Sequence, residues 1–190
     1  MTMPPEVERL QSQMKEAVKA NWKAFLIEGI VLVILGMAAI AIPLLASIAI
    51  TIFLGWLFLI SGVVGLYLTF TTRDMPGFWW SLLSAALAIV AGLVLLVQPI
   101  AGTFTLTIVV SAYFIAEGIT TIMYSLAHQR ELSGRWGWLL VSGLVDLVVA
   151  GLIIAGLPGS ATWALGLLVG INLVFGGTSL IGMALAARDS

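Results

Sequence analysis

Hydrophobic residues form six long runs along the chain, separated by short stretches that carry polar or charged residues. The runs cover approximately residues 24–42, 45–70, 79–97, 101–126, 137–157 and 161–186. An α-helix needs roughly 20 apolar residues to cross about 30 Å of hydrocarbon, and these runs match or exceed that length. The pattern therefore predicts an all-α integral membrane protein with six transmembrane helices.

The first 21 residues are polar and follow a different pattern. Val7, Leu10, Met14 and Val18 recur at spacings of three and four, which is typical of one apolar stripe on an amphipathic helix. The segment lacks the apolar core and cleavage site of a signal peptide. We expect a cytoplasmic or interfacial helix over residues 1–21 that lies on the membrane or packs on a neighbouring subunit, with a solvated tail as the alternative. The transmembrane domain then covers residues 22–190.

An internal repeat organises this domain. A glycine followed seven residues later by a proline occurs in GMAAIAIP, GLVLLVQP and GLIIAGLP; another glycine comes nineteen residues after each proline, and an arginine eleven or twelve after that. The spacing predicts three parallel helical hairpins, at approximately 22–78, 79–136 and 137–190, around a pseudo-three-fold axis along the membrane normal. The repeated positions are Gly36, Gly92 and Gly151; Pro43, Pro99 and Pro158; Gly62, Gly118 and Gly177; and Arg73, Arg130 and Arg188.

These repeated residues have expected structural roles. Each proline ends one helix or opens the next at the outer turn, and Ser47, Thr103 and Ser160 lie where they could cap the returning helix. The glycines let helix backbones approach closely, because helix association in lipid depends on packing rather than on the hydrophobic effect. Gly166 and Gly170 add a GxxxG pair, which supports a tight helix contact.

Composition and charge agree with a membrane location. Of the 190 residues, 61% are hydrophobic and 9% are charged, and the mean hydropathy is +1.16. Every Lys and Arg falls before the first run, between the second and third, between the fourth and fifth, or after the sixth. The positive-inside rule then places both termini in the cytoplasm. Trp22, Trp80 and Trp138 repeat with a period of about 58 residues, and we expect them, with the three repeated arginines, to anchor the inner interface.

Several functional classes are disfavoured. The chain has no cysteine and a single histidine, which argues against disulfides and His/Cys metal sites, and its net charge of −1 does not suit a nucleic-acid partner. It contains no HExxH, phosphate-binding loop or dinucleotide fingerprint. We therefore expect no enzyme activity and no cofactor.

Four strongly polar residues lie within the predicted spans, where such groups are costly and are candidates for function. They are Glu28, Glu117, Asp146 and Asn172. When the hairpins are aligned by their prolines, none of the four recurs in another hairpin. The helical scaffold is therefore repeated three times, whereas each of these polar residues occurs in one hairpin only.

Each of these residues has a structural alternative. Glu28 is placed to pair with a basic residue at the cytoplasmic rim, and Glu117 to form a hydrogen-bonded cluster with Tyr113 and Thr121. Asp146 lies in purely apolar sequence and suits interhelical bonding or proton handling. Asn172 is expected to form an interhelical hydrogen bond. His128, in AHQRE, is a candidate sensor of cytoplasmic pH or an ordinary surface residue.

Three features of the chain carry a resemblance to a known family: the three-hairpin plan, the Gly-x6-Pro turns and the stretch SGLVDLVVAGLII (Ser142 to Ile154). Through them, the chain resembles the HdeD acid-resistance membrane protein family over essentially everything after residue 20. The resemblance implies a bacterial or archaeal cytoplasmic-membrane protein associated with acid stress, and it implies no catalytic residues.

Two functions fit the sequence. The first is a structural or interaction protein in the lipid bilayer, which forms homo-oligomers or binds other membrane proteins during acid stress. The alternative is proton or small-solute conductance through the intramembrane carboxylates. Three carboxylates at one depth do not span a membrane, and the outer halves of the spans offer only Ser and Thr, so the first function is favoured.

Overall fold

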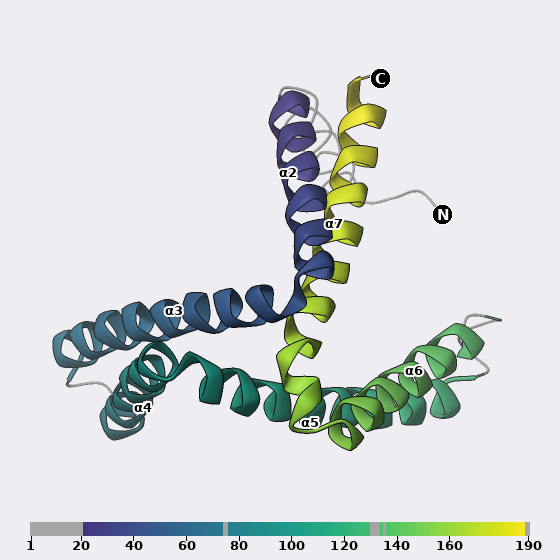
Figure 1. Ribbon diagram of the computed structural model, residues 1–190. Coiled ribbons are helices and arrows are strands. Elements are labelled where there is room, and N and C mark those ends of the chain that lie inside the picture. The colour runs from purple at the N-terminus through teal and green to yellow at the C-terminus, as the bar shows by residue number, and fades with distance from the viewer. Residues whose placement is uncertain (1–20, 74–75, 130–133, 135, 189–190) are drawn as a thin grey trace, which may run out of the picture. The chain divides into compact units, whose positions relative to one another are not determined.

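The computed structural model describes residues 21–73, 76–129, 134 and 136–188, and these form six long helices with no strand among them (Figure 1). All six are long and apolar enough to cross a membrane, so the predicted all-α transmembrane fold is confirmed. The predicted amphipathic helix, apart from Asn21, lies outside the described residues. The elements are α2 (Trp22–Ala41), α3 (Pro43–Thr71), α4 (Phe78–Val97), α5 (Pro99–Ala127), α6 (Trp136–Ala155), the short 3-10 helix η1 (Gly159–Thr162) and α7 (Ala164–Arg188).

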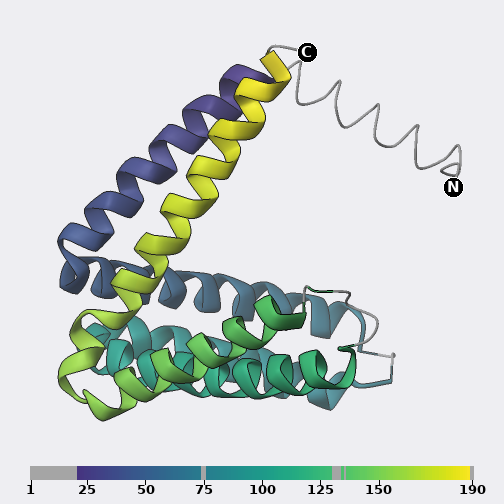
Figure 2. The same ribbon diagram turned by 90° about the vertical axis from the view of Figure 1, so that its right-hand side faces the viewer.

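The chain divides into two compact units, which are described separately. One unit, Leu44–Gly166, contains α3 to α6, η1 and the first residues of α7. In it, α3 packs on α4 and α5 packs on α6. The other unit joins Met1–Pro43 with Leu167–Ser190, and in it α2 and α7 lie side by side (Figures 1 and 2). The predicted three-fold arrangement of the hairpins stays a prediction.

Small residues seven positions apart hold the three helix pairs together. A spacing of seven is about two helical turns, so these residues form one narrow stripe along each helix. The first helix of each hairpin begins with an aromatic residue and then buries two small ones. These buried pairs are Gly29 and Gly36 in α2, Ala85 and Gly92 in α4, and Gly143 and Ala150 in α6.

The backbones meet at these stripes. A Cβ atom built on Gly29 would lie 2.7 Å from the carbonyl oxygen of Gly177, and one on Gly118 would lie 2.7 Å from that of Gly143. Real side-chain carbons do not approach an oxygen so closely. In each pair, therefore, a glycine packs directly against the backbone of the neighbouring helix. The contacts Gly36 with Gly170, Gly62 with Ala85, and Gly92 with Gly55 are of the same kind.

The outer turn of the third hairpin is one residue longer than the turns of the first two hairpins, so aligning the hairpins by their prolines shifts the third one by one residue. Its outer turn, Gly156–Leu157–Pro158, has one residue more before the proline than the turns at Pro43 and Pro99. Alignment by prolines therefore selects Gly151, which is exposed and where an added Cβ atom would have nothing within 4 Å, whereas the buried residue at this level is Ala150. The same comparison of helix starts matches Trp22 with Phe78 and Trp136, and not with Trp80 and Trp138.

The expected helix caps are also different. The Ser47 hydroxyl accepts a hydrogen bond of 2.9 Å from the backbone N–H of Gly166, the third residue of α7, so it caps a helix of another hairpin. The Thr103 hydroxyl donates to the carbonyl of Pro99, and the Ser160 hydroxyl donates to that of Ile153. Pro43 and Pro99 are the first residues of α3 and α5, where a missing N–H costs no helical hydrogen bond.

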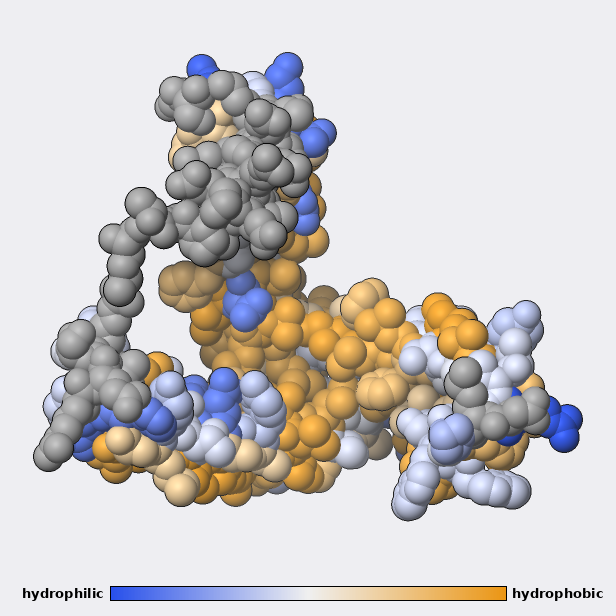
Figure 3. Space-filling model, turned by 180° about the vertical axis from the view of Figure 1, so that it is seen from behind, coloured by the Kyte–Doolittle hydropathy of each residue, from blue (hydrophilic) through white to orange (hydrophobic). Residues whose placement is uncertain are grey.

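Most large apolar side chains face outward and most buried residues are small. Hydrophobic side chains cover much of the face drawn in Figure 3, and hydrophilic ones gather mainly toward helix ends. A water-soluble fold would reverse this arrangement, so the surface suits a lipid solvent.

Candidate functional site

Two of the predicted carboxylates come together where α5 crosses α6. Glu117 directly precedes Gly118, and Asp146 lies one turn after Gly143, so the contact between these two glycines brings the carboxylates to the same place. Both side chains are half-buried and close enough to interact electrostatically. Tyr113, one turn before Glu117 on α5, lies close enough to interact with it electrostatically. Glu117, Asp146 and Tyr113 form a small acidic cluster. The sequence predicts Tyr113 beside Glu117, but it places the two carboxylates only at a common depth.

Glu28 occupies a comparable place on the α2–α7 pair. It is exposed, it directly precedes the contact residue Gly29, and it makes no ion pair with any residue of the described part of the chain. When helices are matched by their first residues, its counterparts are Ser84 in α4 and Ser142 in α6. All three helix pairs thus carry polar side chains beside the glycine contact, although the groups differ.

The other two candidates form few interactions. Asn172 is exposed on α7 and has no hydrogen-bond partner among the described residues, so the expected interhelical bond is not present there. His128 follows the last residue of α5, its ring stacks on Tyr124 at 4.4 Å between centroids, and its Nδ1 lies 3.1 Å from the Tyr124 carbonyl oxygen. No hydrogen bond joins Thr121 to Glu117.

Buried hydroxyls connect the helices at the ends nearest the prolines. Thr51 and Thr103 join α3 to α5 through a hydrogen bond of 2.7 Å between their hydroxyls. Thr107 and Ser111 donate to carbonyls one turn earlier in α5. Among the described residues, no buried side-chain polar atom lacks a partner. Thr51 and Thr103 therefore join two helices, whereas Thr107 and Ser111 bond within α5.

Aromatic side chains lie at the opposite ends of the helices. Trp80 and Trp138 are 78% and 79% exposed, and Arg73 is exposed as well. The guanidinium of Arg188 and the ammonium of Lys23 each lie 5.7 Å from the Trp22 ring, within cation–π range. Arg130 lies outside the described residues.

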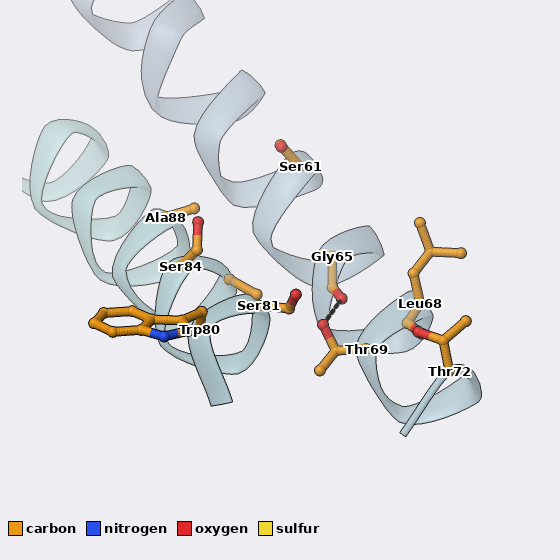
Figure 4. Close-up of a pocket in the computed structure, with 10 residues that line it drawn as sticks. Ser61, Gly65, Leu68, Thr69, Thr72, Trp80, Ser81, Ser84 and Ala88 are labelled. Carbon is orange, nitrogen blue, oxygen red and sulfur yellow. Dashed lines mark hydrogen bonds between the residues drawn. The ribbon is translucent and has the colours of Figure 1, made fainter. Parts of the chain in front are cut away.

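Sequence reasoning missed a groove between α3 and α4, with a volume of about 540 Å³ (Figure 4). Hydroxyl groups from both helices line it, at the ends that face the loop between them. A signal existed in the sequence, because α3 and α4 place several hydroxyl residues one helical turn apart. The lining residues are Ser61, Gly65, Leu68, Thr69, Thr72, Trp80, Ser81, Ser84, Ala85 and Ala88.

A second groove, of about 450 Å³, continues from the first. The two share Trp80, Ser84 and Ala88, but the second is otherwise lined by large or apolar residues nearer the middle of the helices. Its further residues are Phe58, Leu83, Leu87 and Ala91.

Comparisons with known proteins agree with the internal repeat and with the family resemblance seen in the sequence. A family model described as a short repeat of unknown function (DUF308) matches residues 27–97 and again 84–155. Protein HdeD of Escherichia coli strain K12 is 27% identical over 173 residues, which are 89% of this chain and 89% of that protein. The HdeD proteins of Escherichia coli O157:H7 and Shigella flexneri match equally well. The predicted internal repeat and HdeD resemblance are confirmed. No solved structure matches the chain.

Proposed function

Because the chain belongs to the family described as a short repeat of unknown function (DUF308), and is an HdeD-like multi-pass membrane protein, we propose a role in helix packing rather than catalysis. The protein is a non-enzymatic bundle of the bacterial or archaeal cytoplasmic membrane, with both termini in the cytoplasm. It supports the membrane during acid stress by associating with itself or with other membrane proteins.

The closed glycine contacts are the observation that carries this proposal. Gly29 with Gly177 and Gly118 with Gly143 bring backbones together and leave no space between the paired helices. Large apolar side chains cover the outside, where lipid or another transmembrane helix would contact them. Such pairs suit a rigid scaffold better than a moving transporter.

The acidic cluster favours one alternative, which is proton conductance. Glu117, Asp146 and Tyr113 lie together inside the span, and intramembrane carboxylates commonly mark proton paths. The opposing observation is that the buried hydroxyls at the proline ends already have hydrogen-bond partners. Among the described residues, no buried hydroxyl in that direction is left without a partner and free to accept a proton from the cluster.

Proton flux in proteoliposomes distinguishes these functions. Purified protein is reconstituted beside empty liposomes, an acid pH step is applied, and the internal pH is followed with a trapped dye. The wild type, Asp146→Asn and Glu117→Gln should all be as tight as empty liposomes if the protein is a scaffold. Flux in the wild type that either substitution removes would contradict the scaffold proposal and support conductance.

A further inference from the structure

We propose that the two joined grooves on α3 and α4 bind a single phospholipid, with its phosphate against the hydroxyl-lined groove and an acyl chain along the apolar one. This inference goes beyond the scaffold function, and it concerns a helix pair that carries no intramembrane carboxylate.

Free hydroxyls are the first line of support. Thr69 and Thr72 donate to carbonyls of their own helix, at 2.7 and 2.9 Å. The side-chain hydroxyls of Ser61, Ser81 and Ser84, in contrast, make no hydrogen bond within the described part of the chain, and all three residues line the groove (Figure 4). Their hydroxyls can therefore donate to phosphate oxygens, which are strong acceptors.

The start of α4 offers further donors. This helix begins at Phe78, and Gly77 before it makes no side-chain cap hydrogen bond. The backbone N–H groups of Phe78, Trp79 and Trp80 thus lack the partner that a capping side chain would supply, and a helix N-terminus favours an anion. Trp80 lines the groove, and so does Ser81, whose own N–H already donates to the Gly77 carbonyl at 3.0 Å.

The apolar continuation identifies the occupant as a lipid. The second groove shares Trp80 and Ser84 with the first and then runs between Phe58, Leu83 and Leu87. An occupant that fills both must be polar at one end and hydrocarbon along the rest. Inorganic phosphate would leave the apolar part empty, and an apolar partner helix would offer the free serine hydroxyls no acceptor.

The α5–α6 pair provides a natural contrast. Its residues at the levels of Ser61 and Ala88 are Glu117 and Asp146, whose carboxylates, when ionised, would repel a phosphate. Ser142 is its counterpart of Ser84 and is also exposed. A substitution there tests the general effect of a larger side chain at this level of a helix pair.

Native mass spectrometry of delipidated full-length protein tests the proposal. The protein is titrated with phosphatidylglycerol, with diacylglycerol, which lacks phosphate, and with glycerol 3-phosphate, which lacks acyl chains. The variants are Ser84→Leu, which fills both grooves; the double substitution Ser61→Ala and Ser81→Ala, which removes hydroxyls and keeps the shape; and Ser142→Leu as the matched control.

We expect the wild type and Ser142→Leu to bind one phosphatidylglycerol equally. Ser84→Leu and the double variant should bind it about tenfold more weakly, which corresponds to about 1.4 kcal/mol. Diacylglycerol should bind more weakly than phosphatidylglycerol to the wild type and to Ser142→Leu. Equal binding by all variants, equal binding of diacylglycerol, or glycerol 3-phosphate binding as tightly as the lipid would each overturn the proposal.

Discussion

Gly118 and Gly151 both belong to the glycines that repeat in the sequence and yet have opposite surroundings. A Cβ on Gly118 would meet the carbonyl oxygen of Gly143 at 2.7 Å, whereas nothing lies within 4 Å of one on Gly151. At the scale of single residues, glycine is therefore required in one case by a backbone contact and is merely tolerated in the other.

Substituting each of these glycines with alanine tests that difference. Gly118→Ala should lower the free energy of unfolding by about 1–3 kcal/mol, because α5 and α6 must separate to admit the methyl group. Gly151→Ala should leave stability unchanged or raise it by about 0.5–1 kcal/mol, since alanine favours a helix. Thermal unfolding in detergent, followed by circular dichroism, measures both. Equal losses in the two variants would show that the close contact is not decisive.

Ser47 is the residue whose role the sequence placed on the wrong helix. Its hydroxyl accepts from the Gly166 N–H in a buried position, so Ser47→Ala leaves that N–H unpaired. We expect a loss of about 1–3 kcal/mol and faster hydrogen exchange of the Gly166 amide. Thr105→Ala is the matched control, because its exposed hydroxyl bonds only the Ala101 carbonyl of its own helix. If the exchange rate of Gly166 does not change, the cap is unimportant.

Residue roles were predictable where they depend on local spacing alone. The prolines at residues 43 and 99 open helices, as chemistry requires of a residue without an N–H. The Ser47 cap and the choice of Ala150 over Gly151 were not predictable, because one depends on a partner 119 residues away and the other on one added residue in a turn.

At the scale of elements, hydrophobic runs predicted all six helices with ends close to those observed, because lipid imposes a length on each span. The partners of each helix were harder to predict. The glycine stripes join the second helix of one hairpin to the first helix of the next, as α3 joins α4 and α5 joins α6, while α7 joins α2. The spacing of small residues shows that one side of a helix carries a narrow stripe for close packing, but it does not show which other helix packs against that stripe.

Engineered disulfides test these pairings, and the cysteine-free chain gives no background. A Cβ on Gly170 would lie 3.1 Å from that of Ala39, and one on Gly65 would lie 3.2 Å from that of Ala85. Slight separation brings both pairs into the range of about 3.5–4.5 Å that a disulfide needs. We expect oxidation to cross-link Ala39→Cys with Gly170→Cys, and Gly65→Cys with Ala85→Cys.

The control for α2 and α7 combines Ala39→Cys with Gly176→Cys, since Gly176 has nothing within 4 Å of its Cβ position. It should remain uncrosslinked on reducing and non-reducing gels. Cross-links in the control as strong as in the Gly170 pair would contradict the pairing. A Gly170 cross-link found only between chains would mean that α2 and α7 pair across two copies of the protein.

At the scale of the whole molecule, the charge distribution predicts how the chain is threaded through the membrane. The turns at Pro43, Pro99 and Pro158 carry no Lys or Arg, and the remaining connections and termini carry all eight. Translocating a basic loop is unfavourable, so the proline turns should face outward. Two exposed glutamines are predicted to lie on opposite sides of the membrane: Gln98 at a proline turn and Gln129 after α5.

Cysteine labelling of these two positions tests the threading. In intact cells, a membrane-impermeant maleimide should label Gln98→Cys, and should label Gln129→Cys only after lysis, because the second cysteine lies beside the cytoplasmic arginines. The cysteine-free parent chain is the blank for both. The reverse pattern would invert the molecule, which would move the groove on α3 and α4, with its exposed Trp80, to the outer leaflet. The lipid seated there would then come from the outer leaflet, whereas the glycine contacts between helices would be unaffected.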